Sequence, residues 1–253
     1  MRAFKRLILM IQFLTTIPVP INLDVSEEDF GKGLLFAPLV GFLIGGIIAG
    51  SFFLLRTIFP PSVTAVFIII LYIVLTGGIH LDGLGDTSDG IFSNRPKERM
   101  LEIMRDSRVG TNAVLAVFCV LALDAVIIGS INSFYIFKVL LLMPVAGRIG
   151  SLTGAAASTY ARNGTGLGKS FIDCCGIREV IPGIILYSLL FYAITGVPGV
   201  LLCIFSFISA FVLVKLLGKK IGGATGDILG AVCELNQTLF LILAYVFIHF
   251  KVL

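Results

Sequence analysis

Three aspartates recur at helical spacing in one glycine-rich stretch of the chain. Asp82, Asp86 and Asp89 stand at positions i, i+4 and i+7, which places them within about 60° of one another on a helix. Carboxylates this close repel one another, and a bound cation relieves the repulsion. Hard oxygen ligands suit Mg²⁺, which typically takes one or two carboxylates together with phosphate oxygens of a substrate. The spacing therefore predicts a Mg²⁺ site at Asp82, Asp86 and Asp89 rather than a solvated loop whose acids only neutralise nearby arginines.

The same stretch supplies candidates for proton transfer. His80 precedes the first aspartate by two residues, and either it or one of the carboxylates can accept a proton from an attacking hydroxyl. We assign catalytic roles to Asp89 and His80 and favour Asp89 as the base. The interspersed glycines leave room for a bulky phosphorylated ligand to approach the backbone.

Basic residues that could bind phosphate follow the acids. An apolar stripe over residues 100–104 predicts an amphipathic interfacial helix, and its neighbouring arginines could equally clamp phosphates in bidentate fashion. Arg148 falls inside an apolar run, where a charge normally faces the bundle interior. We favour a position near a pyrophosphate; the alternatives are an arginine that reaches the inner surface or a structural pair with an aspartate. Asp227 could hold a metal or cap a helix. The predicted substrate-binding residues are Arg99, Arg105, Asp106, Arg108, Arg148, Arg162, Lys169 and Asp227.

Residues 163–170 imitate a phosphate-binding P-loop without satisfying its pattern. The motif needs glycine at position 163, where this chain has asparagine, and it needs a preceding strand, whereas residues 155–158 continue an apolar run. An ATPase is therefore excluded. A glycine-rich loop containing Arg162 and Lys169 can still contact a phosphate through backbone N–H groups.

The composition identifies the elements that must position these residues. Of 253 residues, 57% are hydrophobic and 13% are charged, and the mean hydropathy is +1.05, which excludes soluble and disordered classes. We predict one all-α domain over residues 1–253, a polytopic membrane bundle with an interfacial helix at the N-terminus, where apolar and basic residues alternate at helical spacing. The predicted spans are 34–55, 62–79, 113–131, 137–157, 180–196, 199–217 and 231–250.

The distribution of charge predicts the orientation. Seven spans place residues 1–33, 80–112, 158–179 and 218–230 on one side, together with nearly all lysines and arginines. The exceptions are Arg56, Lys138 and Lys251. The positive-inside rule puts that side, and the N-terminus, in the cytoplasm. The acids follow the same division, which that rule does not require, so we expect the loops 80–112, 158–179 and 218–230 to form a catalytic face. The net charge of +4 is too small to indicate nucleic-acid binding, and five cysteines without a C-x-x-C pair predict neither disulfides nor a zinc site.

Motifs along the whole chain resemble the cobalamin synthase family, the adenosylcobinamide-GDP ribazoletransferases, which are membrane enzymes of late vitamin B12 biosynthesis. The runs that carry the resemblance are residues 13–20, 38–41, 77–90, 105–111, 161–168 and 223–231, with Glu234. Gln237 departs from the pattern, because many relatives have a second acid there. No carboxylate role at that position is carried over.

The resemblance implies a Mg²⁺-dependent transferase that joins adenosylcobinamide-GDP to α-ribazole, or to its 5′-phosphate, and releases GMP. It also implies a prokaryotic inner-membrane location, small-molecule substrates and a possible homo-oligomer. Two alternatives remain open at this point. A CDP-alcohol phosphotransferase also gathers aspartates around D-x-x-D-G, here residues 86–90, but the usual downstream elements are absent. A secondary transporter would place its acids near the midplane and often shows internal repeats.

Overall fold

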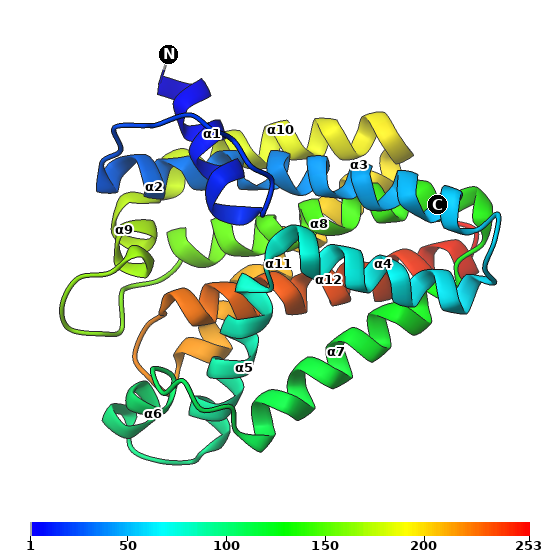
Figure 1. The fold of residues 1–253 in the computed structure, drawn as a ribbon. Helices are drawn as coiled ribbons and strands as arrows, with labels where there is room; N and C mark the ends of the chain where they lie inside the picture. Colours follow the sequence, from blue (N-terminus) through cyan, green and yellow to red (C-terminus); the bar gives the residue numbers. More distant parts are fainter. Residues whose placement is uncertain (1) are drawn as a thin grey trace.

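Helices account for nearly all regular structure in the computed structural model, which describes residues 2–253 (Figure 1). Within that range the only β-pairing is one isolated bridge between Tyr160 and Ala224. Seven helices run between the two ends of the molecule: α3 (Ala37–Leu55), α4 (Pro61–Thr76), α7 (Thr111–Ser130), α8 (Ser133–Ala156), α10 (Ile177–Thr195), α11 (Val197–Gly218) and α12 (Gly226–His249). The predicted all-α polytopic bundle is confirmed.

Short helices gather toward one end of the bundle, on the left of Figure 1. They are α1 (Arg2–Leu14), α2 (Glu27–Gly33), α5 (Ile79–Phe92), α6 (Lys97–Ile103) and α9 (Leu167–Cys174), and a 3₁₀ turn (Leu34–Phe36) joins α2 to α3. The chain starts at this end and finishes at the other, as an odd number of crossings requires.

Six helices are long and apolar enough to cross a membrane, and the seventh crossing involves a bent pair, α4 and α5, whose axes differ by 93°. The prediction of one span over 62–79 therefore ran too far, because α4 ends at Thr76. Gly77 and Gly78 adopt φ of 62° and 71°, a left-handed conformation that costs glycine little and other residues more. The turn directs α5 along the inner ends of the spans, so we treat α5 as lying outside them.

Close contact between α3 and α8 depends on two small residues. Gly41 and Gly45 face the backbone of α8 at Pro144 and Leu141, where an added Cβ would clash, whereas Gly46 has open space beside it. Small residues at positions 41 and 45 thus permit close packing of α3 on α8. Every residue of α8 from 139 to 155 is buried, so α8 forms the centre of the bundle.

The N-terminal helix α1 is amphipathic, as predicted, but its apolar face covers the bundle end. Ile8, Leu9, Met10 and Leu14 are buried. On its polar side, Lys5 Nζ and Arg6 Nε donate to Asp29 of α2 at 2.7 Å and 3.1 Å. This ion-pair group holds the two short helices together.

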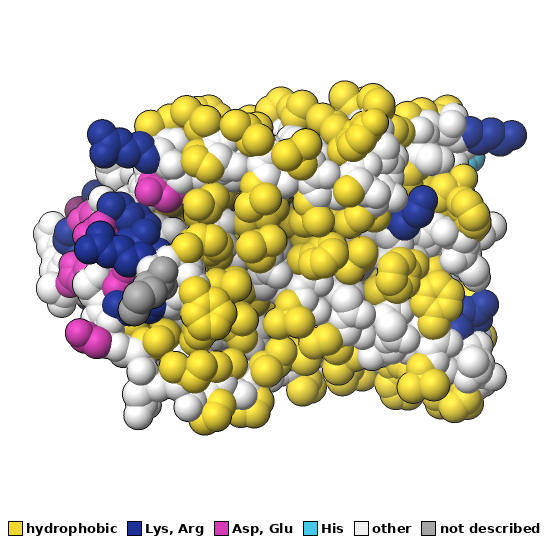
Figure 2. Space-filling view, turned by 90° about the horizontal axis from the view of Figure 1, so that it is seen from above, with side chains coloured by type: hydrophobic (Ala, Val, Ile, Leu, Met, Phe, Trp, Pro, Cys, Tyr) yellow, Lys and Arg dark blue, Asp and Glu magenta, His cyan; other side chains and the backbone are white. Residues whose placement is uncertain are grey.

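Charged side chains follow the division seen in the sequence. In Figure 2 the acidic and most of the basic side chains gather at the end that carries the short helices, and the sides are largely hydrophobic. The opposite end shows only a few separate basic groups. A band of apolar surface between two polar ends is typical of a protein that spans a bilayer.

Candidate active site

Helix α5 carries the three predicted metal ligands and is held tightly against α12. A Cβ on Gly83 would lie 2.7 Å from the Asp227 carbonyl oxygen, and one on Gly230 would lie 3.1 Å from the His80 carbonyl oxygen. Only glycine at these two positions lets the backbones approach so closely. As a result, the start of α12 brings Asp227 beside the acids of α5.

Asp82 and Asp86 have the features of ligands for a hard cation. Asp82 is exposed and Asp86 is half-buried, and within residues 2–253 the only α5 aspartate that accepts hydrogen bonds is Asp89. Burial, followed by the charges of Asp82 and Asp227, raises the pKa of Asp86 to about 7. Several carboxylates with free oxygens and mutual repulsion form a donor set that suits Mg²⁺.

Asp89 has a second task that the sequence did not reveal. Its Oδ2 accepts the N–H of Gly110 at 2.6 Å, and its Oδ1 accepts the N–H of Ala113 at 3.0 Å. These donors lie at the start of α7, where backbone N–H groups lack partners within the helix. Asp89 therefore caps α7 from another helix, and a carboxylate there is also favoured by the helix dipole.

Asp227 is a fourth carboxylate at the site. It pairs with Arg162 at 2.8 Å, and the cap of α12 is Thr225, whose Oγ1 accepts the N–H of Ile228. The alternative role of Asp227 as a helix cap is thus taken by Thr225. The charges that act on Asp86 come from Asp82, Asp89, Asp227 and Arg162, so the structure brings these predicted residues together.

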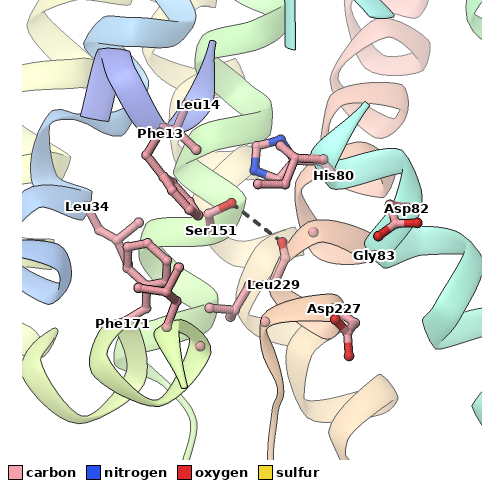
Figure 3. Close-up of a pocket in the computed structure, with 15 residues that line it drawn as sticks. Phe13, Leu14, Leu34, His80, Asp82, Gly83, Ser151, Phe171, Asp227 and Leu229 are labelled. Atoms are coloured by element: carbon pink, nitrogen blue, oxygen red, sulfur yellow. Dashed lines mark hydrogen bonds between the residues drawn. The ribbon is translucent and has the colours of Figure 1, made fainter. Parts of the chain in front are cut away.

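Two cavities adjoin the acids, and Asp82 lines both of them. The first, here called the α7 cavity, has a volume of about 830 Å³ and is formed by Asp82, Asp86 and Asp89 together with apolar residues of α7 such as Val117 and Phe118. The second, here called the aromatic pocket, has a volume of about 200 Å³ (Figure 3). Its lining includes Phe13, Leu34, His80, Ser151, Phe171, Asp227 and Leu229.

The predicted basic residues differ in their surroundings. Arg105 and Arg162 line one hollow of about 230 Å³, so both can reach a single ligand. The others are engaged at the surface with nearby acids: Arg99 with Glu102, Arg108 with Asp106, and Lys169 with Asp173. These ion pairs join residues that are close in sequence and say nothing about a substrate. Substrate binding by Arg99, Asp106, Arg108 and Lys169 therefore stays a prediction.

Arg148 lies apart from the acids of α5. Its side chain is completely buried, lines neither cavity beside the acids, and donates to Tyr72 Oη at 3.0 Å and to Gln237 at 3.4 Å. Tyr72 in turn donates to Glu234 at 2.7 Å. Among residues 2–253, Arg148 thus reaches Glu234 only through Tyr72, and the role of Arg148 near a pyrophosphate stays a prediction.

His80 lies between this buried group and the aromatic pocket. It is 7% exposed, and its Nδ1 lies 3.4 Å from Cys233 Sγ and 3.9 Å from Glu234 Oε1. Its ring points into the space between Phe13 and Ser151 (Figure 3). Sequence reasoning missed Tyr72 and Ser151, which lie in ordinary apolar runs. It also missed Phe171, which lies in the predicted loop 158–179.

Comparisons with known proteins agree across the chain. The family model described as cobalamin-5-phosphate synthase matches residues 6–245. A protein of Acetivibrio thermocellus named adenosylcobinamide-GDP ribazoletransferase is 60% identical over 247 residues, which are 98% of this chain and all of that protein. One of the same name from Clostridium acetobutylicum is 57% identical over 251 residues, 99% of this chain and all of the relative. No solved structure matches the chain.

Proposed function

Because the chain belongs to the cobalamin-5-phosphate synthase family, we propose that it is a membrane-bound transferase of late cobalamin biosynthesis that joins adenosylcobinamide-GDP to α-ribazole or its 5′-phosphate. Relatives so similar over their whole length carry the ribazoletransferase name. The resemblance inferred from the motifs is thereby confirmed. The phosphotransferase and transporter alternatives are not favoured.

The observation that carries the mechanism is the position of the four carboxylates between two cavities of different size. A reaction between two substrates needs two binding volumes that meet at the reacting atoms. Asp82 lines both cavities, and Asp86 lies beside it. We propose that Asp82 and Asp86, with Asp89 and Asp227 beside them, hold a Mg²⁺ ion. When bound, the ion would neutralise the diphosphate and stabilise charge in the transition state.

In the proposed reaction a ribose hydroxyl oxygen forms a bond to the cobinamide-side phosphorus. The bond between that phosphorus and the bridging oxygen breaks, and GMP leaves with the bridging oxygen. Arg162 and Arg105 line one hollow, and we propose that they bind the phosphate of the departing GMP. Arg162 is further held in place by Asp227.

The hydroxyl proton requires an acceptor, for which the sequence suggested Asp89 or His80. Both oxygens of Asp89 already accept backbone N–H groups, and the Nδ1 of His80 faces Cys233. Asp86 lines the α7 cavity, and within residues 2–253 its oxygens accept no hydrogen bond, so they are free to take a proton from a substrate there. We therefore propose Asp86 as the base, with Asp89 positioning α7 and its backbone.

We place the charged end of the molecule in the cytoplasm of a prokaryotic cell, with the protein in the inner membrane. Support comes from the lysines and arginines gathered at that end and from the polar substrates, which are made in the cytosol. The association of copies into a homo-oligomer stays a prediction.

The test is product formation by protein purified in detergent with adenosylcobinamide-GDP, α-ribazole and Mg²⁺. We expect GMP and the joined product from the wild type. We expect Asp82→Asn and Asp86→Asn to lower turnover by about 10²-fold or more, because each removes charge at the developing transition state. Asp24→Asn is the matched control, since Asp24 is an exposed loop residue that lines neither cavity.

Two results would overturn these proposals. Near-normal turnover in both Asp82→Asn and Asp86→Asn would remove the metal site. Failure of the folded wild type to release GMP in the presence of both substrates and Mg²⁺ would remove the proposed reaction.

A further inference from the structure

The aromatic pocket is too small for a macrocycle and has the surface of a site for a flat ring. Its volume of about 200 Å³ is below the roughly 300–1,000 Å³ of pockets that hold drug-sized ligands. Phe13 from α1 and Phe171 from α9 form one side, and Leu34 and Leu229 lie near them (Figure 3). The pocket therefore fits one apolar group of a substrate and leaves the larger donor to the α7 cavity.

The phenylalanines of this pocket are held in fixed orientations. The rings of Phe13 and Phe171 lie 5.2 Å apart between centroids, and Phe30 of α2 packs edge-on against both, at 6.1 Å and 5.8 Å. Such rings offer faces and edges on which an aromatic ligand packs favourably. Three separate helices contribute the cluster, so its shape depends on the fold and not on one flexible segment.

His80 is one of the polar residues that line this pocket, with Asp82, Ser151 and Asp227. The Nδ1 of His80 contacts Cys233 Sγ at 3.4 Å. Within residues 2–253, its other nitrogen, Nε2, forms no hydrogen bond. If the thiol donates to Nδ1, then Nε2 carries the hydrogen and is a donor. The His80 ring points into the pocket, and Asp82 and Asp227 lie on the side away from Phe13 and Phe171 (Figure 3).

We propose that the aromatic pocket is the subsite for the base of the riboside acceptor, a flat bicyclic heteroaromatic ring with one unsubstituted ring nitrogen. In α-ribazole this base is a dimethylbenzimidazole. The apolar face of the base packs on Phe13 and Phe171, its free nitrogen accepts the His80 Nε2 hydrogen, and the attached ribose extends toward Asp82. This assignment rests on the proposed function and makes His80 a specificity residue instead of a proton acceptor.

The first test fills the pocket. Ser151 is buried on α8 and lines the pocket, so Ser151→Leu places a larger side chain where the base would lie. We expect the KM for α-ribazole to rise at least tenfold and the KM for adenosylcobinamide-GDP to stay within twofold. Val117→Phe, which fills the α7 cavity, is the matched variant and should raise the KM for the donor instead.

A second variant avoids overpacking. Phe13→Leu removes one aromatic face without adding volume, and it should raise the KM for α-ribazole several-fold while the protein elutes as the wild type does in size-exclusion chromatography. His80→Gln retains a donor and should preserve the preference for benzimidazole over an indole riboside, whereas His80→Ala should abolish that preference.

The outcomes separate this assignment from the reaction itself. If the wild type transfers but Ser151→Leu and Phe13→Leu leave the KM for α-ribazole unchanged, the pocket assignment is wrong and the proposed reaction stands. If the wild type forms no product, the proposed reaction is wrong. The pocket assignment is then tested by calorimetry of free 5,6-dimethylbenzimidazole with protein in nanodiscs. A tenfold weaker binding of this base to Ser151→Leu than to the wild type supports the pocket assignment. Equal binding to the two proteins overturns it.

Discussion

Replacing Gly83 by alanine tests the contact that sets the spacing between the α5 acids and Asp227. An added Cβ would lie 2.7 Å from the Asp227 carbonyl oxygen, whereas ordinary contact begins at 3.4 Å, so the helices must separate by about 0.7 Å (3.4 − 2.7). The obstructing atoms belong to backbone and cannot rotate away. Because misplacements near 1 Å cost up to about 10²-fold in rate, we expect kcat/KM for product formation to fall about 10–100-fold.

The stability effect of this change is modest, which keeps the activity assay interpretable. Overpacking costs about 1–3 kcal/mol, and alanine recovers up to about 1 kcal/mol of helix propensity. Gly46→Ala is the control, since a Cβ there meets nothing within 4 Å, and it should retain full activity. Full turnover in Gly83→Ala, or an equal loss in Gly46→Ala, would refute the reasoning.

Three further predictions concern titration and buried charge. The pKa of Asp86 is raised to about 7 without a cation, so protons compete with Mg²⁺ below that pH. We expect the Kd for Mg²⁺, measured by calorimetry, to rise up to about tenfold from pH 7 to pH 6. A constant Kd would contradict the proposed metal site. Hydrogen bonding to Lys5 holds the pKa of Asp29 well below its ordinary value of 3.8, so its stabilisation is present above that value and is lost as the pH falls below it. Asp29→Asn should therefore lower stability by about 1–2 kcal/mol at pH 7, with the difference in thermal melting shrinking below pH 4; an unchanged difference would show that the charge is not responsible. Asp124 of α7 is 1% exposed, and neither of its carboxylate oxygens has a hydrogen-bond partner within residues 2–253. Asp124→Leu should therefore raise the free energy of unfolding by about 1–3 kcal/mol and leave product formation intact. Loss of product formation would instead assign this acid to the reaction.

The sequence predicted the spans well because hydropathy depends on long apolar runs, which local composition reveals. It predicted the second span three residues too long, since Ile79 continues the apolar run beyond the glycine pair that bends the chain. Adjacent glycines at 77 and 78 were the available signal. The aspartate spacing was correctly assigned to one helix, because the period of a helix is visible locally.

Contacts between distant segments were not predictable from one chain. Arg148 and Tyr72 are 76 residues apart, and no local pattern indicates which buried group an arginine will meet. The capping of α7 by Asp89 likewise depends on how α5 and α7 pack. The aromatic pocket combines Phe13 with Phe171, which only the folded bundle brings together.

The brevity of α4 has a consequence for the surrounding lipid. Its 16 residues span about 24 Å at 1.5 Å per residue, less than the roughly 30 Å thickness of the hydrocarbon layer. We therefore expect the carboxylates that follow the bend to lie close to the boundary between acyl chains and water. We therefore expect the proposed site to respond to bilayer thickness: longer acyl chains should submerge the acids and slow product formation, whereas shorter chains should leave the acids hydrated.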